Sequence, residues 1–158
     1  MLLLANLLQL FDTRKTVTER NRSDADGYID EAWDTLDFVV GALSRAGMSS
    51  DESETDASGQ KEYVVKIMPW RSRDVTHLLR IVDDDRNTSN GFGDARPGNA
   101  PRKRTVQRPR SVAARQAPSG LPLNFYDPVW YQGLSKSDKR ALNVQDTVEL
   151  PTIDQVRG

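Results

Sequence analysis

The chain has 158 residues and a formal net charge of -1, with 37% hydrophobic residues, 28% charged residues and no cysteine. Without cysteine it cannot form disulfides, zinc–thiolate sites or thiol nucleophiles, and its share of Leu, Ile, Val and Phe barely exceeds the roughly 20% that marks disordered chains. We therefore expect a mainly α chain of three to four helices with one short strand, and with roughly half of its length disordered.

Residues 1–47 are expected to form a helical segment of two helices. Leu4, Leu7, Leu8 and Phe11 follow the spacing i, i+3, i+4, i+7. This spacing predicts an amphipathic helix from about residue 2 to about residue 18. The apolar run at its start is too short to cross a bilayer, because a membrane-spanning helix needs roughly 20 apolar residues. We expect no membrane partner.

The second helix is predicted within residues 24–47. Its apolar residues from Tyr28 to Leu43 fall on one face, as in an amphipathic helix. Asp24 or Asp26 would cap its start, because an Asp side chain accepts hydrogen bonds from the first free amides.

Residues 48–61 form an acidic segment without apolar periodicity, which predicts a disordered loop. Ser49 and Ser53 each precede an acidic residue by three positions, a spacing that suits an acidophilic kinase, so both are candidate phosphorylation sites. Residues 24–62 together carry a net charge of -9.

Residues 62–83 are expected to form a strand followed by a helix. The β-branched residues between Tyr63 and Met68 predict a short strand, which has no obvious partner in the sequence. Ser72 is placed to cap the helix that follows. The apolar stripe of this helix is Val75, Leu78, Leu79 and Val82.

Residues 84–120 are rich in glycine and proline, which predicts a disordered linker. Residues 95–126 carry a net charge of +7. The basic residues are Arg96, Arg102, Lys103, Arg104, Arg108, Arg110 and Arg115. They would contact nucleic-acid phosphates or serve as a nuclear import signal, or form a solvated linker that contacts the acidic half of the chain.

Residues 121–143 contain a cluster of aromatic residues and are expected to form two short helices. Asp127 and Pro128 are typical of a helix start, and Ser135 with Asp138 resembles a capping box. Residues 144–158 are expected to be an extended tail.

Two interpretations of this aromatic motif stay open. Either it folds back onto Trp33 and Leu36 of the second helix, or it docks on a partner protein, because Trp and Tyr are favoured interface anchors. The candidate anchors are Phe125, Tyr126, Trp130, Tyr131 and Leu134.

Few residues could support catalysis. His77 is the only histidine, and it is predicted to lie on the exposed face of its helix. Asp30, Asp34 and Asp37 share one helix face, but no partner helix with a histidine completes a dimetal pattern, so a solvated acidic face is expected. We predict no catalytic residue, no cofactor and no metal.

The order of three motifs resembles a family of uncharacterised, multi-copy fungal (mushroom-type) open reading frames associated with mobile elements. The motifs are "GMSSDESE", "YVVKIMPWRSRDVTHLL" and "GLPLNFYDPVWYQGLSKSDKRAL", with a basic spacer between the last two, and they cover roughly residues 45–150. The resemblance implies no known activity, catalytic residue or cofactor.

The sequence favours an intracellular, non-enzymatic protein that binds an unknown partner protein. The alternative is a DNA-binding accessory factor of a mobile element, which would act in the nucleus through the basic segment 96–115.

Overall fold

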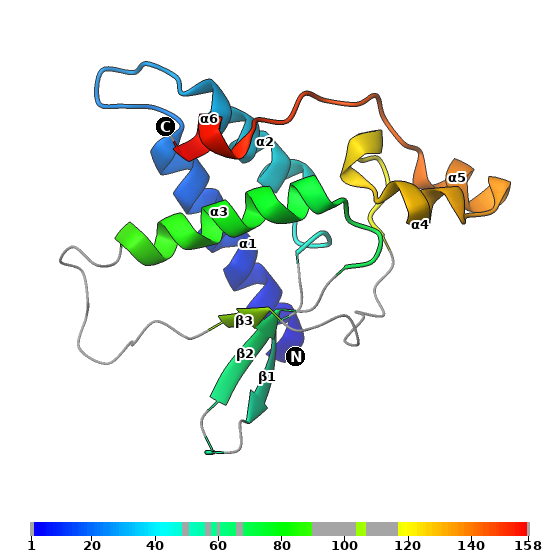
Figure 1. Ribbon diagram of the computed structural model, residues 1–158, viewed down its shortest axis with the longest axis horizontal. Helices are drawn as coiled ribbons and strands as arrows, with labels where there is room; N and C mark the ends of the chain where they lie inside the picture. Colours follow the sequence, from blue (N-terminus) through cyan, green and yellow to red (C-terminus); the bar gives the residue numbers. More distant parts are fainter. Residues whose placement is uncertain are drawn as a thin grey trace.

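The computed structural model describes residues 2–48, 51–55, 58–59, 61–65, 68–89, 104–106 and 117–157. The described part is mainly helical, which confirms the expected class (Figure 1). The α-helices are α1 (Leu2–Asn21), α2 (Glu31–Leu43), α3 (Arg73–Ser89), α4 (Pro128–Gln132), α5 (Lys136–Leu142) and α6 (Ile153–Arg157), and η1 (Leu123–Phe125) is a 3-10 helix.

The three long helices form the centre of the molecule. α1 packs against both α2 and α3, and Figure 1 shows α3 crossing α1. Two groups of buried side chains fill the contacts. We call the group that includes Val39, Met68 and Tyr126 the aromatic core. The group that includes Trp33, Leu36 and Leu78 is the helical core.

The start of α2 lies later in the chain than the sequence predicts. Its N-cap is Asp30, whose carboxylate accepts hydrogen bonds from the amides of Ala32 and Trp33, so the prediction of Asp24 or Asp26 is wrong. Asp24 instead closes the preceding turn, where its Oδ1 accepts the amide hydrogens of Asp26 and Tyr28.

α3 confirms the predicted apolar stripe and the predicted cap. The four stripe residues are buried, and Ser72 Oγ accepts the amide hydrogen of Val75 at 3.3 Å. The helix continues to Ser89, beyond its predicted end at residue 83. Asp85 accepts hydrogen bonds from Arg20 and Asn21 of α1, and these bonds stabilise the additional turn.

The structure contains a three-stranded sheet, whereas the sequence predicts a single strand. The two additional strands lie in the predicted acidic loop and in the predicted linker. β1 (Asp51–Thr55) pairs antiparallel with β2 (Lys61–Val65), and β3 (Arg104–Val106) pairs with β2 in parallel. In the view of Figure 1 the sheet lies below the long helices. The acidic segment thus supplies the partner that the predicted strand lacked, because backbone pairing needs no apolar pattern on both strands.

The C-terminal region folds onto the long helices. Three backbone hydrogen bonds join residues 120–123 to residues 142–145, such as the one from Leu123 N–H to the carbonyl of Gln145 at 2.9 Å. The amide side chain of Asn124 pairs with the backbone of Val148. The tail is extended only up to residue 152, because residues 153–157 form α6, whose Val156 is buried in the helical core.

The loop after α2 depends on a glycine at position 47. A Cβ atom there would lie 2.7 Å from the carbonyl oxygen of Leu43 and 2.8 Å from its Cβ. We expect Gly47→Ala to lower the free energy of unfolding by about 1–3 kcal/mol, measured by urea denaturation, because backbone atoms must move to accept the methyl group.

Gly41→Ala is the matched control. Its Cβ would meet only Lys15 Nζ, at 3.8 Å, and the residue is exposed within α2. Because Ala favours a helix interior over Gly by about 0.8–1.0 kcal/mol, this variant should be more stable than the natural chain. If both substitutions changed the free energy of unfolding in the same direction, the described packing would be contradicted.

Candidate interaction surfaces

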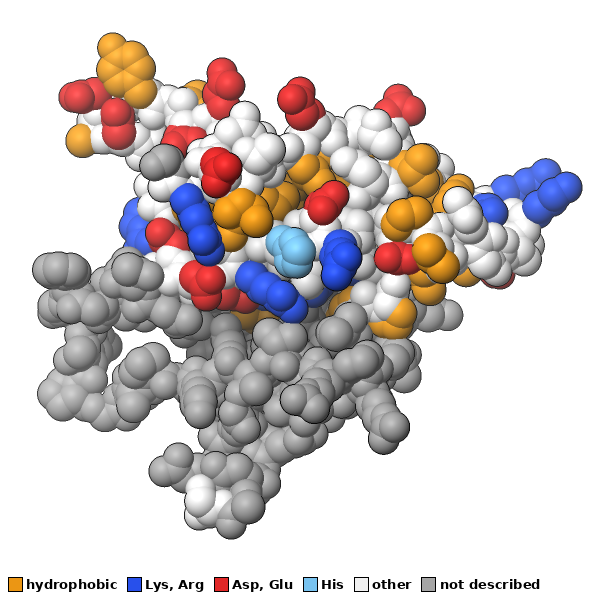
Figure 2. Space-filling model, viewed as in Figure 1, with side chains coloured by type: hydrophobic (Ala, Val, Ile, Leu, Met, Phe, Trp, Pro, Cys, Tyr) orange, Lys and Arg blue, Asp and Glu red, His pale blue; other side chains and the backbone are white. Residues whose placement is uncertain are grey.

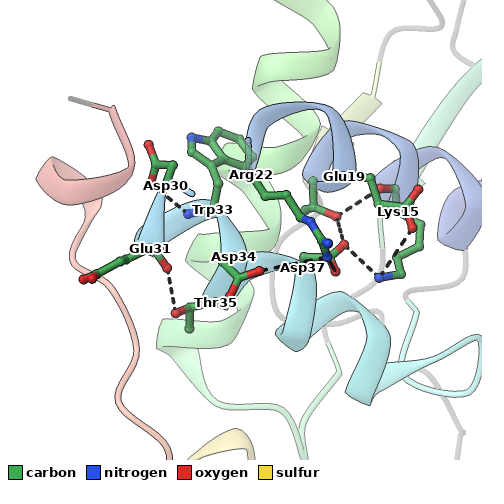
Figure 3. Close-up of polar contacts among 10 residues, drawn as sticks. Lys15, Glu19, Arg22, Asp30, Glu31, Trp33, Asp34, Thr35 and Asp37 are labelled. Carbon is green, nitrogen blue, oxygen red and sulfur yellow. Dashed lines mark hydrogen bonds and ion pairs between the residues drawn. The ribbon is translucent and has the colours of Figure 1, made fainter. Parts of the chain in front are cut away.

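The acidic face of α2 is solvated at Asp30 and Asp34, as expected, but Asp37 is buried against α1, so the expectation is wrong for Asp37. Asp37 accepts hydrogen bonds from Lys15 Nζ at 2.8 Å, from Thr18 Oγ1 at 2.8 Å and from Arg22 Nη1 at 3.2 Å. Figure 3 shows Lys15 and Arg22 turned toward Asp37. The contact of Asp34 with Arg22 is longer, at 4.0 Å, and more exposed. These residues serve packing between helices.

The surroundings of Asp37 favour its charged form. Burial alone would raise the pKa of this carboxyl group, but the hydrogen bonds from Lys15 and Thr18 and the charges of Lys15 and Arg22 outweigh burial. The net result is a pKa below the ordinary value of an aspartate. Folding is therefore stabilised by the ionised carboxylate.

Two buried arginines join α1, α3 and the loop after α2. Arg14 forms a two-point contact with Asp83, with Nε to Oδ1 at 2.8 Å and Nη2 to Oδ2 at 2.6 Å. Arg71 donates Nη1 to the carbonyl oxygen of Gly47 at 3.1 Å and Nε to Thr76. Burial lowers the pKa of Arg71 to about 9, and the charge of Arg14 acts in the same direction, so Arg71 stays protonated at neutral pH.

The aromatic motif packs on its own chain. Phe125 and Tyr126 are buried, and the ring of Phe125 meets Phe38 of α2 edge-on, at 6.5 Å between centroids. Tyr126 lies beside Trp70 at 6.2 Å, and its hydroxyl group donates to the carbonyl of Pro118 at 2.6 Å. Phe125 and Tyr126 therefore cannot act as docking anchors while the chain keeps this fold.

The neighbours of the motif differ from those predicted. Trp33 and Leu36 belong to the helical core, where they pack with α1, α3 and α6. The aromatic motif instead contacts Phe38 and the next turns of α2. The sequence could not distinguish these faces, because the apolar arc of α2 is broad enough to serve two groups of neighbours.

The outer members of the motif remain partly accessible. Trp130, Tyr131 and Leu134 are half-buried and pack on the aromatic core. Val129 of α4 is 79% exposed, Phe38 is 49% exposed and Leu123 is 41% exposed. Figure 2 shows apolar side chains gathered over the end of the molecule that holds η1 and α4. We call Val129, Leu123 and the neighbouring Trp130 the outer α4 face.

The helix starts at this face are as the sequence predicts. Asp127 accepts the amide hydrogen of Trp130 at 2.9 Å, and Pro128 opens α4. Ser135 Oγ accepts the amide hydrogen of Asp138 and opens α5. Each short helix thus begins at a side-chain cap that satisfies one of its free amides.

The basic segment lies mainly outside the described residues. Arg96, Arg102, Lys103, Arg108, Arg110 and Arg115 fall there, as does Ser49. For Arg104 and Ser53 the structure describes only the backbone, in β3 and β1. The expected disorder of the linker likewise falls on residues outside those described, except that α3, β3 and residues 117–120 enter its predicted range.

The remaining candidates for chemistry are at the surface. His77 is exposed on α3, and Figure 2 shows basic side chains around the histidine. Within the described ranges, no group of three His, Cys, Asp or Glu side chains is placed to hold a metal ion. None of the described helices is long and apolar enough to cross a membrane.

Sequence reasoning missed the pairing of α1 with α2. The signal was present, because Lys15, Thr18 and Arg22 form a polar stripe at spacings of three and four residues. Such a stripe faces one side of a helix. It is complementary in charge to the acidic stripe of α2, and the two stripes meet at Asp37.

The chain belongs to a family of unknown function. The family model described as "Domain of unknown function (DUF8263)" matches residues 13–158. This range covers α2 to α6 and the second part of α1, so the family includes the helical core and all buried residues of the aromatic core except Leu10. No curated protein and no solved structure matches the chain.

Asp37→Asn tests the buried charge network. The neutral side chain leaves Lys15 and Arg22 without their counter-charge, so we expect the free energy of unfolding to fall by about 1–3 kcal/mol at pH 7. Asp34→Asn is the control, because this exposed side chain makes only the longer contact. In this variant the free energy of unfolding should fall by less than about 0.5 kcal/mol.

The effect of Asp37→Asn should also depend on pH. Because the folded state lowers the pKa of Asp37, its stabilisation is complete above the unfolded value of about 3.9. It is lost as the pH falls through the lower, folded value. Urea denaturation should show the two chains converging below about pH 4. If the difference in unfolding free energy between the natural chain and Asp37→Asn stayed the same at low pH, the charge network would be contradicted.

Proposed function

We propose that the protein is a non-enzymatic interaction protein that binds a partner protein through the outer α4 face. The proposal rests mainly on Val129, which is 79% exposed. Contiguous exposed apolar patches on a folded surface usually mark an interaction site, and Figure 2 shows apolar side chains gathered at this end of the molecule.

The position of Val129 supports this function. It lies in a helix whose N-cap is the Asp127 carboxylate and whose C-cap amide, at Gly133, donates to the carbonyls of Tyr131 and Val129. The inner side of the same segment is fixed by the ring of Tyr126, which stacks on Trp130 at 6.1 Å. A partner would thus meet a surface that is already ordered, and ordering would cost little on binding.

The proposal changes which residues act as anchors. The candidates Phe125 and Tyr126 are buried beneath the surface, Trp130 belongs to it, and Tyr131 and Leu134 are half-buried. Val129 and Leu123 replace the two buried aromatics as the side chains that a partner would contact first.

Val129→Asp tests the proposal directly. The full chain and the variant would each be used to recover bound proteins from cells of the source organism, with quantification by mass spectrometry. We expect the proteins bound by the natural chain to be recovered about tenfold less with Val129→Asp, because a charge would have to be buried at the centre of the interface.

Ile29→Asp is the matched control. Ile29 is 65% exposed and lies in the loop between α1 and α2. Figure 1 shows this loop at the other end of the molecule from α4. This variant should recover the same proteins as the natural chain. Equal losses for both variants, or no loss for Val129→Asp, would contradict a role of the outer α4 face.

A second function is favoured by the charge of the basic segment, and we propose it as the alternative. The net charge of +7 over residues 95–126 suits binding to DNA phosphates, as in a nuclear accessory factor of a fungal mobile element. The middle of the basic segment would then be held in the sheet as β3, which pairs with β2.

Salt dependence distinguishes this alternative. Binding of the full chain to duplex DNA should weaken steeply between about 50 and 200 mM salt, and neutralising Arg102, Lys103, Arg104, Arg108 and Arg110 together should abolish it. A control variant with Lys136, Lys139 and Arg140 of α5 changed to Gln should bind as the natural chain does. Binding that survives the five substitutions would exclude this alternative.

A further inference from the structure

The C-terminal helix α6 is too short to be stable by itself. It spans five residues, Ile153–Arg157, whereas isolated helices shorter than about 12–15 residues are marginal in water. Its only local support is a cap in which Thr152 and Gln155 exchange hydrogen bonds, with the Thr152 amide to Gln155 Oε1 at 2.8 Å. The helix therefore owes its conformation to the surface beneath it.

That surface is apolar and is formed by side chains of the three long helices. Val156 is the one buried residue of α6, and it belongs to the helical core. The other members of this core are Val17 of α1, Trp33 and Leu36 of α2, and Leu78, Ile81 and Val82 of α3. Figure 1 shows α6 beside α2 and above α3. We call this surface the α6 groove.

Residues 143–152 form a tether that connects α6 to the rest of the fold. These residues contain no helix, and after the backbone hydrogen bonds of Gln145 they are held by the pairing of Asn124 with Val148. Beyond that point Leu150 packs against both cores, and Val156 is the last anchor. One buried valine at the end of a tether opens more readily than the core of the long helices, because local opening costs less where few apolar contacts break.

We propose that the α6 groove is a helix-binding site and that α6 is its internal, displaceable occupant. The partner it fits is a short amphipathic helix of another protein with an aliphatic side chain in the place of Val156. Binding of a helix through its apolar face in a hydrophobic groove is a common mode of recognition. The occupant seen in the structure establishes which chemistry the groove accepts.

This site is separate from the outer α4 face. The α6 groove is lined by the helical core, whereas α4 packs on the aromatic core. The inference therefore does not rest on the proposed function, and either can fail alone. Removal of α6 would expose Trp33, which is 8% exposed in the structure.

The test uses a labelled peptide of residues 144–158 and three full-length chains: the natural chain, Val156→Asp and Ile153→Asp. In Val156→Asp the chain's own α6 leaves the groove, because the aspartate would be buried without a partner. We expect this chain to bind the peptide at least about tenfold more tightly than the natural chain, since the tethered occupant no longer competes.

Ile153→Asp is the matched control. It introduces the same charge on α6 at a residue that is 44% exposed, so the tethered helix should stay in place and block the peptide as in the natural chain. In the NMR spectrum of Val156→Asp with peptide, the indole signal of Trp33 should shift while those of Trp70 and Trp130 stay unchanged. A peptide that itself carries V156D should not bind.

Three results would overturn the proposal. The first is a folded Val156→Asp chain that does not bind the peptide, and the second is equal binding to all three chains. The third is a natural chain that dimerises by exchange of α6, which would make a second copy the occupant. If Val156→Asp fails to fold, Val156→Ala weakens the anchor without a charge and gives the same readout, with a smaller gain in peptide affinity.

Discussion

A short backbone pairing holds the aromatic motif in the fold and positions two helices. Residues 70–72 run antiparallel to residues 125–127, with Ser72 N–H to the carbonyl of Phe125 at 2.8 Å and Asp127 N–H to that of Trp70 at 2.7 Å. The side chains of Ser72 and Asp127 cap α3 and α4 at the same time. Each residue therefore joins the pairing through its backbone and starts a helix through its side chain. The direction of the outer α4 face depends on this pairing.

Buried charges fix the register of the long helices. Asp37 pairs with Lys15 of α1 and with Arg22, which follows α1, and both carboxylate oxygens of Asp83 in α3 accept hydrogen bonds from Arg14. Buried ion pairs contribute little net stability, but breaking one leaves a charge without its partner, which is costly. They thus disfavour any arrangement of α1, α2 and α3 that separates the partners. The apolar stripes alone would allow such shifts, because aliphatic side chains make no directional contact.

Local signals in the sequence predicted much of the fold. The caps at Ser72, Asp127 and Ser135 and the stripe of α3 were recognisable because they depend on neighbouring residues. The contacts between segments that are distant in the sequence were not recognisable. The acidic strand β1 has no apolar alternation, and the broad arc of α2 did not show that Trp33 faces α6 while Phe38 faces the aromatic motif. These features arise only when distant segments meet.

The most direct test of this account is amide hydrogen exchange in the full chain, measured by NMR at Ser72 and Asp127. If the aromatic motif is part of the fold, both amides are bonded to buried carbonyl groups and should exchange more than roughly a hundredfold more slowly than in an unstructured peptide. The exchange rates of these two amides should rise with urea concentration in parallel with those of the amides of α2. Exchange at the unstructured rate at both positions would show that the motif does not pack on its own chain, and would contradict the account.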